Sequence, residues 1–217
     1  MSPDSRQQVP CPFGPSIDGT TTPKIPAGAP RAREAQVYAV WMPHGGWARI
    51  VVTRVQQDRS LNRSIRIYGF APICASIDAL RAIGSRDLCA AEVNLISLTA
   101  ELAIRLGRWQ LLFTLPHFKH DDWPVACLSS DVPWQYVLMP PGDFTNCELN
   151  SRIRVPIDIA SQFPQSGLNT VVGVEWQLEA AIEGGWKGRR PFASGPILPM
   201  CLDPWELVLK RFGLRAP

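Results

Sequence analysis

The sequence has few lysines, no long apolar run and no closely spaced cysteines. The most apolar stretch, residues 88–104, contains Glu92, Asn94 and Glu101. A helix that spans a bilayer needs about 18 or more predominantly apolar residues, so the sequence predicts none. The first fifteen residues have neither an apolar centre nor a small-residue cleavage site, so we expect no secretory signal and a location in the cytoplasm or nucleus.

The six cysteines are widely and irregularly spaced, and no C-x-x-C pair occurs. A structural zinc site needs closely paired ligands, and stable disulfides are typical of secreted chains. We therefore expect reduced, mostly buried thiols and no metal.

Catalytic signatures are also lacking. The sequence contains no G-x-S-x-G, no Walker-type phosphate loop and no G-x-G-x-x-G. The one histidine cluster runs from His117 to Asp122 and includes His120 and Asp121. Its position after Pro116 favours a solvated loop, although a metal or acid/base site built on these side chains remains an alternative. The prediction is a protein that is not an enzyme and that uses no cofactor.

The composition is typical of a chain that folds around an apolar core, apart from its proline-rich first residues. Of the 217 residues, 46% are apolar, and 8 Trp and 8 Phe supply large core side chains. Seven of the 21 prolines fall in residues 1–35, which predicts a flexible Pro-rich arm, and residues 36–217 are expected to form a single globular domain.

Hydrophobic periodicity and capping residues predict the elements of that domain. Strands are expected at residues 48–55, 64–70, 109–115, 134–139, 152–159 and 170–182, the first two as a hairpin. Helices are expected at residues 77–83 after the capping Ser76, at 88–106, and at the C-terminus from Asp203 to Phe212. In residues 152–159, Pro156 lacks a backbone donor and favours an edge strand or a bulge. Strands and helices segregate, which predicts an α+β fold with a mainly antiparallel sheet packed against two central helices and a C-terminal helix.

Charge is segregated along the chain, although the overall net charge is only +3. Residues 49–108 carry a net charge of +4, residues 109–186 carry −6, and residues 187–217 carry +4. Arginine outnumbers lysine 18 to 4, which suits bidentate contacts with phosphate. The predicted membrane- or phosphate-binding residues are Arg49, Arg54, Arg59, Arg63, Arg66, Lys187, Arg189 and Arg190.

In layout, residues 36–214 resemble the matrix proteins of rhabdoviruses and related non-segmented negative-strand RNA viruses. The features that carry the resemblance are the Pro-containing arm, the aromatic strand ending in a Pro-rich loop (WQYVLMPPGDF), the long amphipathic segment NTVVGVEWQLEAAI and the late helix ending in Phe212-Gly213-Leu214. The arm carries neither a lysine cluster nor a P-P-x-Y motif.

The resemblance implies a viral structural protein for virion assembly that binds the inner membrane leaflet, packs against the nucleocapsid or its RNA, and self-associates into a homo-oligomer. It would be found in the host cytoplasm or nucleus, at the membrane periphery and in the virion. The alternative hypothesis is a nucleic-acid-binding or small capsid protein, in which the same arginines contact RNA.

Overall fold

The structure is a computed structural model of the whole chain. It describes residues 7–15, 23–56, 63–123, 128–132, 135–139, 153–160, 163, 168–184 and 204–215.

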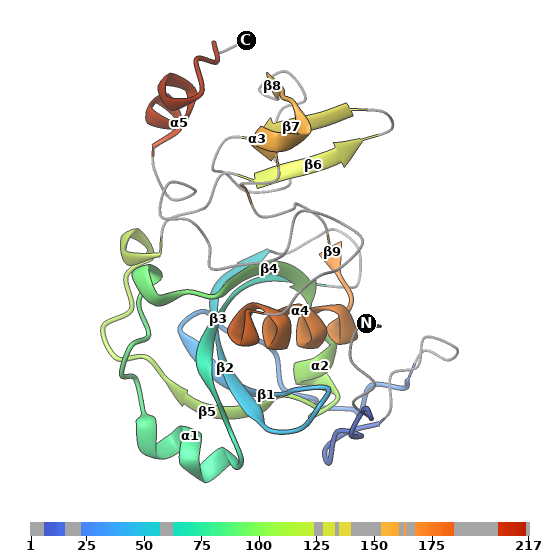
Figure 1. Cartoon of the computed structure of the whole chain (residues 1–217). Helices are drawn as coiled ribbons and strands as arrows, with labels where there is room; N and C mark the ends of the chain where they lie inside the picture. The colour runs from blue at the N-terminus through green and yellow to red at the C-terminus, as the bar shows by residue number, and fades with distance from the viewer. Residues whose placement is uncertain are drawn as a thin grey trace.

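A six-stranded, mostly antiparallel sheet forms the larger layer (Figure 1). Its strand order is β5-β1-β2-β3-β4-β9, and only the last pair is parallel. The strands are β1 (Gln36–Trp41), β2 (Trp47–Gln56), β3 (Ser64–Cys74), β4 (Leu95–Ala100), β5 (Gln110–Thr114) and β9 (Leu168–Asn169). The hairpin expected at residues 48–55 and 64–70 is confirmed as β2 and β3, and the strand at 109–115 is confirmed as β5.

A three-stranded antiparallel sheet, β6-β7-β8, lies above the larger one in Figure 1 with two short helices beside it. It consists of β6 (Leu128–Val132), β7 (Gln135–Met139) and β8 (Ile153–Arg154), and the helices are α3 (Ile157–Ala160) and α5 (Trp205–Arg211). One cluster of buried side chains includes Tyr68 of β3, Leu138 of β7 and Val208 of α5. An apolar core therefore joins the two sheets, and the fold class is α+β, as predicted.

The first helix, α1 (Ile77–Ile83), matches its prediction at both ends. The side chain of Ser76 accepts a hydrogen bond from the backbone N–H of Ala79 at 3.1 Å, which caps the helix start. Gly84 ends the helix with φ of 63°. Local capping residues mark both ends of this helix, and its Leu80 is buried against Ala39 and Trp47.

The helix predicted at residues 88–106 is wrong. The structure has a single 3-10 turn, η1 (Ala90–Glu92), then strand β4, then a one-turn helix, α2 (Leu102–Arg105). Strand β4 is buried along its middle and pairs with β3, with Leu98 opposite Arg66. The leucines at helical spacing were compatible with either structure, and pairing with β3 favours the strand.

The strand predicted at residues 170–182 is also wrong, because this segment forms the longest of the described helices, α4 (Val171–Glu183). Thr170 caps it by accepting a hydrogen bond from the N–H of Gly173 at 3.0 Å, and Gly184 ends it in the left-handed conformation. Its apolar buried positions are Val171, Val174, Leu178 and Ala181. Their spacing of three and four residues is typical of a helix, and the alternation that suggested a strand used Trp176, which is exposed.

Helix α4 lies across β3 and β4 and covers that part of the larger sheet (Figure 1). A glycine allows the close approach: a Cβ on Gly69 of β3 would collide with the side chain of Leu178. The missing side chain on the strand and the leucine on the helix therefore fit together.

The strand predicted at residues 152–159 is confirmed only at its start, as β8. At Pro156 the chain turns into α3, and the N–H of Ala160 donates to the carbonyl of Pro156 at 3.0 Å. Proline suits the beginning of a helix because its missing N–H would have no partner there. Pro156 lies outside the strand, so the edge position or bulge predicted for it is not found, although β8 is the outer described strand of its sheet.

The C-terminal helix is confirmed as α5, with Val208 and Leu209 buried and Lys210 and Arg211 in its last turn. Pro204 occupies the capping position, and the predicted cap Asp203 lies outside the described residues. The segment 134–139 is confirmed as β7.

The described parts of the predicted arm, residues 7–15 and 23–35, are irregular but contact the larger sheet. The backbone N–H of Ala32 and the guanidinium of Arg31 both donate to the buried carboxylate of Glu101, at 3.1 and 3.0 Å. Ala32 is 1% exposed. These contacts arise because Glu101 lies buried directly after β4 with its carboxylate oxygens directed at residues 31–32.

Candidate binding surfaces

The predicted basic face on β2 and β3 is partly internal. Arg49 is fully buried, and its guanidinium donates to the carbonyl oxygens of Gly84, Arg86 and Ala71 at 2.8 to 3.0 Å. Burial lowers the pKa of Arg49, an effect that the charge of Asp87 partly offsets. Arg49 is thus a structural residue that holds the segment after α1 against β3, and it does not contribute to an exposed phosphate-binding face.

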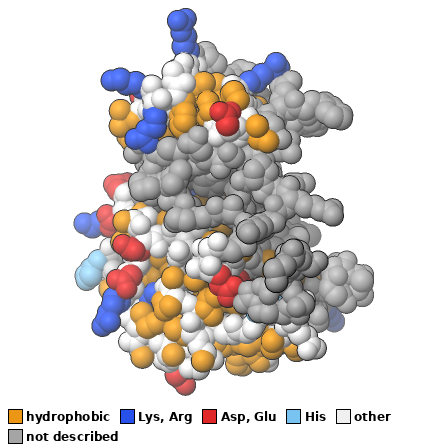
Figure 2. Space-filling model, in the orientation of Figure 1, with side chains coloured by type: hydrophobic (Ala, Val, Ile, Leu, Met, Phe, Trp, Pro, Cys, Tyr) orange, Lys and Arg blue, Asp and Glu red, His pale blue; other side chains and the backbone are white. Residues whose placement is uncertain are grey.

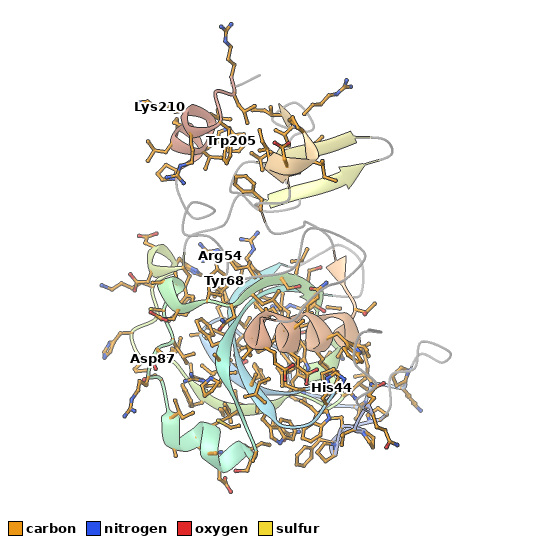
Figure 3. The ribbon with its side chains drawn as sticks, in the orientation of Figure 1. His44, Arg54, Tyr68, Asp87, Trp205 and Lys210 are labelled. Carbon is orange, nitrogen blue, oxygen red and sulfur yellow. The ribbon has the colours of Figure 1, made fainter. Side chains whose placement is uncertain are left out.

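Arg66 is also buried, with only 3% exposure, and it lies directly opposite Arg54 in the β2–β3 pair. Arg54 and Arg63 are half-buried. Figure 3 shows Arg54 and Tyr68 on the side of the larger sheet that faces the small sheet. Burial raises the pKa of Tyr68 to about 12, although the charges of Arg66 and Arg54 act in the opposite direction.

The other four predicted basic residues lie outside the described residues: Arg59, Lys187, Arg189 and Arg190. The structure therefore brings Arg54 and Arg66 together, but toward the interior. Hydrophobic periodicity could not distinguish an exposed arginine from a buried one, because both faces of a central strand can be covered, one of them by a second layer.

Exposed basic side chains occur on several parts of the molecule, including the unit formed by the small sheet, α3 and α5. Arg154, Lys210 and Arg215 are exposed there. The same unit exposes two large apolar side chains, Leu207 at 53% and Ile157 at 46%. Figure 2 shows Lys and Arg side chains around apolar ones on this part of the molecule, and Figure 3 shows Lys210 on α5. We call these five residues the basic–apolar surface.

A buried ionic cluster lies beneath α4. The guanidinium of Arg108 donates two hydrogen bonds to the carboxylate of Glu175, at 2.6 and 2.5 Å, and Trp109 donates a third at 3.2 Å through its indole N–H. Burial alone lowers the pKa of Arg108, but the hydrogen bonds and charge of Glu175 more than compensate, and the pKa is raised overall.

One turn further along α4, Glu179 binds the loop between β1 and β2. Its carboxylate accepts a hydrogen bond from the backbone N–H of His44 at 3.0 Å and lies 2.7 Å from the Nδ1 atom of the same residue. The His44 ring also packs edge-on against Trp176. Sequence reasoning missed both glutamates because it predicted a strand at residues 170–182. Their spacing of four residues, between the cap at Thr170 and Gly184, was the signal that could have revealed them.

The histidine loop is exposed. His120, Asp121 and Asp122 form a short turn, η2 (His120–Asp122), and the imidazole of His120 lies 3.2 Å from the carboxylate of Glu34. Within the part of the chain that the structure describes, no three His, Cys, Asp or Glu side chains are arranged to hold a metal ion. The described cysteines, Cys11, Cys74 and Cys89, are free thiols, but the first two are only half-buried and Cys89 is exposed, so the expected burial is wrong for these three.

No family model, curated protein or solved structure matches this chain. Among the described helices, none has the length and apolar character needed to cross a bilayer.

Proposed function

We propose that this protein is a non-enzymatic assembly protein of the viral matrix type, which binds an anionic membrane surface through the basic–apolar surface and packs against a nucleocapsid while it self-associates. The observation that carries the proposal is the exposure of Lys210, Arg215 and Arg154 on the same unit as the exposed Leu207 and Ile157. The proposal therefore places the phosphate-binding residues on α5 and β8. It does not use the arginines of β2 and β3, two of which are buried.

Physical chemistry supports this pairing of side chains. A basic residue close to an anionic leaflet contributes about 1 kcal/mol to binding, and an apolar side chain gains further free energy when it enters the boundary between headgroups and acyl chains. The helix C-terminus also concentrates the basic residues Lys210 and Arg211 in one turn. The net charge of +4 over residues 187–217 extends the same tendency.

The test is flotation of nuclease-treated protein with vesicles of phosphatidylserine and phosphatidylcholine. We expect the wild type to float and the double variant Lys210→Glu, Arg215→Glu to lose at least tenfold in apparent affinity, since two attractive charges become repulsive. The matched control is Lys24→Glu, Lys119→Glu, which makes the same change in net charge at two exposed positions elsewhere. It should float like the wild type at moderate salt.

Equal loss in both double variants would show that only net charge matters and would contradict the proposed surface. The wild type could instead fail to float with vesicles and bind single-stranded RNA in a salt-dependent manner. That result would support the alternative of a nucleic-acid-binding or small capsid protein.

A further inference from the structure

Residues 9–14 lie on the larger sheet in the manner of a bound peptide. The backbone N–H of Val9 donates to the carbonyl of Pro43 at 2.8 Å, and the carbonyl of Val9 accepts a hydrogen bond from the indole N–H of Trp41 at 2.9 Å. Both backbone polar groups of Val9 are therefore bound. In Figure 1 this segment, coloured dark blue, lies beside the ends of β1 and β2.

The other end of the segment is recognised by shape. The ring of Phe13 packs at 5.6 Å from that of Trp47, which in turn contacts Trp41 edge-on. Gly14 has φ of +71°, and a Cβ placed on it would lie 3.0 Å from the carbonyl oxygen of Leu106. The surface thus accepts an aromatic side chain followed by glycine and excludes a larger residue at the second position.

The segment is only partly buried. Val9 remains 40% exposed and Phe13 remains 41% exposed while docked, so part of each apolar side chain still faces solvent. Pro10 and Pro12 fix two φ angles within residues 9–14, which reduces the entropy lost on docking. These are the properties of an exchangeable peptide ligand.

We propose that Trp41, Pro43, Trp47 and the turn at Leu106–Arg108 form a peptide-docking surface, that residues 9–14 occupy it in cis, and that its external ligand is a proline-containing segment of a partner protein that bends at an aromatic–glycine pair. Because the cis segment has an effective concentration of about millimolar, a second copy with identical contacts does not displace it. A partner segment displaces it by adding contacts beyond those of Phe13 and Gly14. This proposal is independent of membrane binding.

The test uses a full-length variant in which residues 9–14 can no longer occupy the docking surface. The variant Gly14→Val cannot place its side chain against Leu106, whereas the control Gly28→Val has the same backbone strain, with φ of +74°, and open space around it. The probe is a fluorescein-labelled peptide of residues 7–15 with Cys11→Ser, measured by anisotropy. We expect Gly14→Val to bind it at least tenfold more tightly than the wild type or the control, because the cis competitor is removed.

A receptor variant checks that binding occurs at this surface. Adding Trp41→Phe to Gly14→Val keeps an aromatic ring but removes the N–H donor to Val9, and should weaken peptide binding about fivefold, the effect of one net hydrogen bond. If Gly14→Val does not fold, Phe13→Ala takes its place in the same assay. This variant weakens the docking of residues 9–14 by removing the aromatic ring.

Equal peptide affinity in folded Gly14→Val and wild type, or no effect of Trp41→Phe, would overturn the proposal. Light scattering gives a further check. A wild-type dimer that Gly14→Val converts to a monomer would show that the segment of a second copy occupies the surface, and would overturn cis occupation.

Discussion

The Arg108–Glu175 pair allows a quantitative test of what holds α4 on the sheet. The two side chains are 8% and 2% exposed, and Glu175 also accepts from the indole of Trp109. A buried pair of this kind gains Coulomb energy but loses the hydration of both charges, so its net contribution is small while the loss of one partner is costly.

The magnitudes follow from what each substitution leaves behind. Glu175→Leu leaves the Arg108 charge buried without a counter-ion and Trp109 without its acceptor, and should lower the free energy of unfolding by about 4 kcal/mol. Arg108→Met leaves Glu175 with the Trp109 bond alone and should cost about 3 kcal/mol. In the double variant neither charge remains, so we expect a loss of no more than about 2 kcal/mol, less than in either single variant.

The assay is urea denaturation followed by far-ultraviolet circular dichroism, with equal m-values required for the comparison. Glu92→Leu makes the same substitution at an exposed position and should change stability by no more than about 0.5 kcal/mol. If the losses in the two single variants add in the double variant, the carboxylate and guanidinium are not coupled, and the account of α4 docking is refuted.

Two further predictions concern local features of the same fold. Thr170→Ala removes the side-chain acceptor for the N–H of Gly173 and should lower the free energy of unfolding by about 1 kcal/mol, with Thr170→Ser retaining most of the wild-type value in the same denaturation assay. Because burial raises the pKa of Tyr68 to about 12 from 10.0, its contribution is fully present below pH 10 and is lost as the pH rises toward 12, where the unfolded chain ionises first. Denaturation between pH 9 and 12 should therefore show a steeper loss in the wild type than in Tyr68→Phe, by up to about 2.5 kcal/mol, and parallel curves for the two proteins would contradict the assigned burial.

The elements that sequence reasoning predicted correctly have local causes. Strands β2 and β3 alternate side chains over many residues, and α1 has a capping serine and a terminal glycine within its own sequence. These signals do not depend on what packs nearby. The α+β class followed from the same observations.

The two large errors have a tertiary cause. Residues 95–100 have leucines at helical spacing, but pairing with β3 makes them a strand. Residues 171–183 contain many β-branched residues, yet the absence of a side chain at Gly69 lets a helix approach the sheet closely and bury Glu175 and Glu179 against Arg108 and the loop at His44. A local sequence pattern does not indicate which distant residues will pair with a strand or pack against a helix.

The basic residues considered for binding divide in the same manner. The sequence by itself determined that arginines are abundant and concentrated in two regions, and that the last helix ends in basic residues. Only the tertiary structure decided that Arg49 and Arg66 face inward while Lys210 and Arg215 face outward, because the burial of a charged side chain depends on the layers that cover its strand or helix and on the carbonyl or carboxylate groups those layers provide.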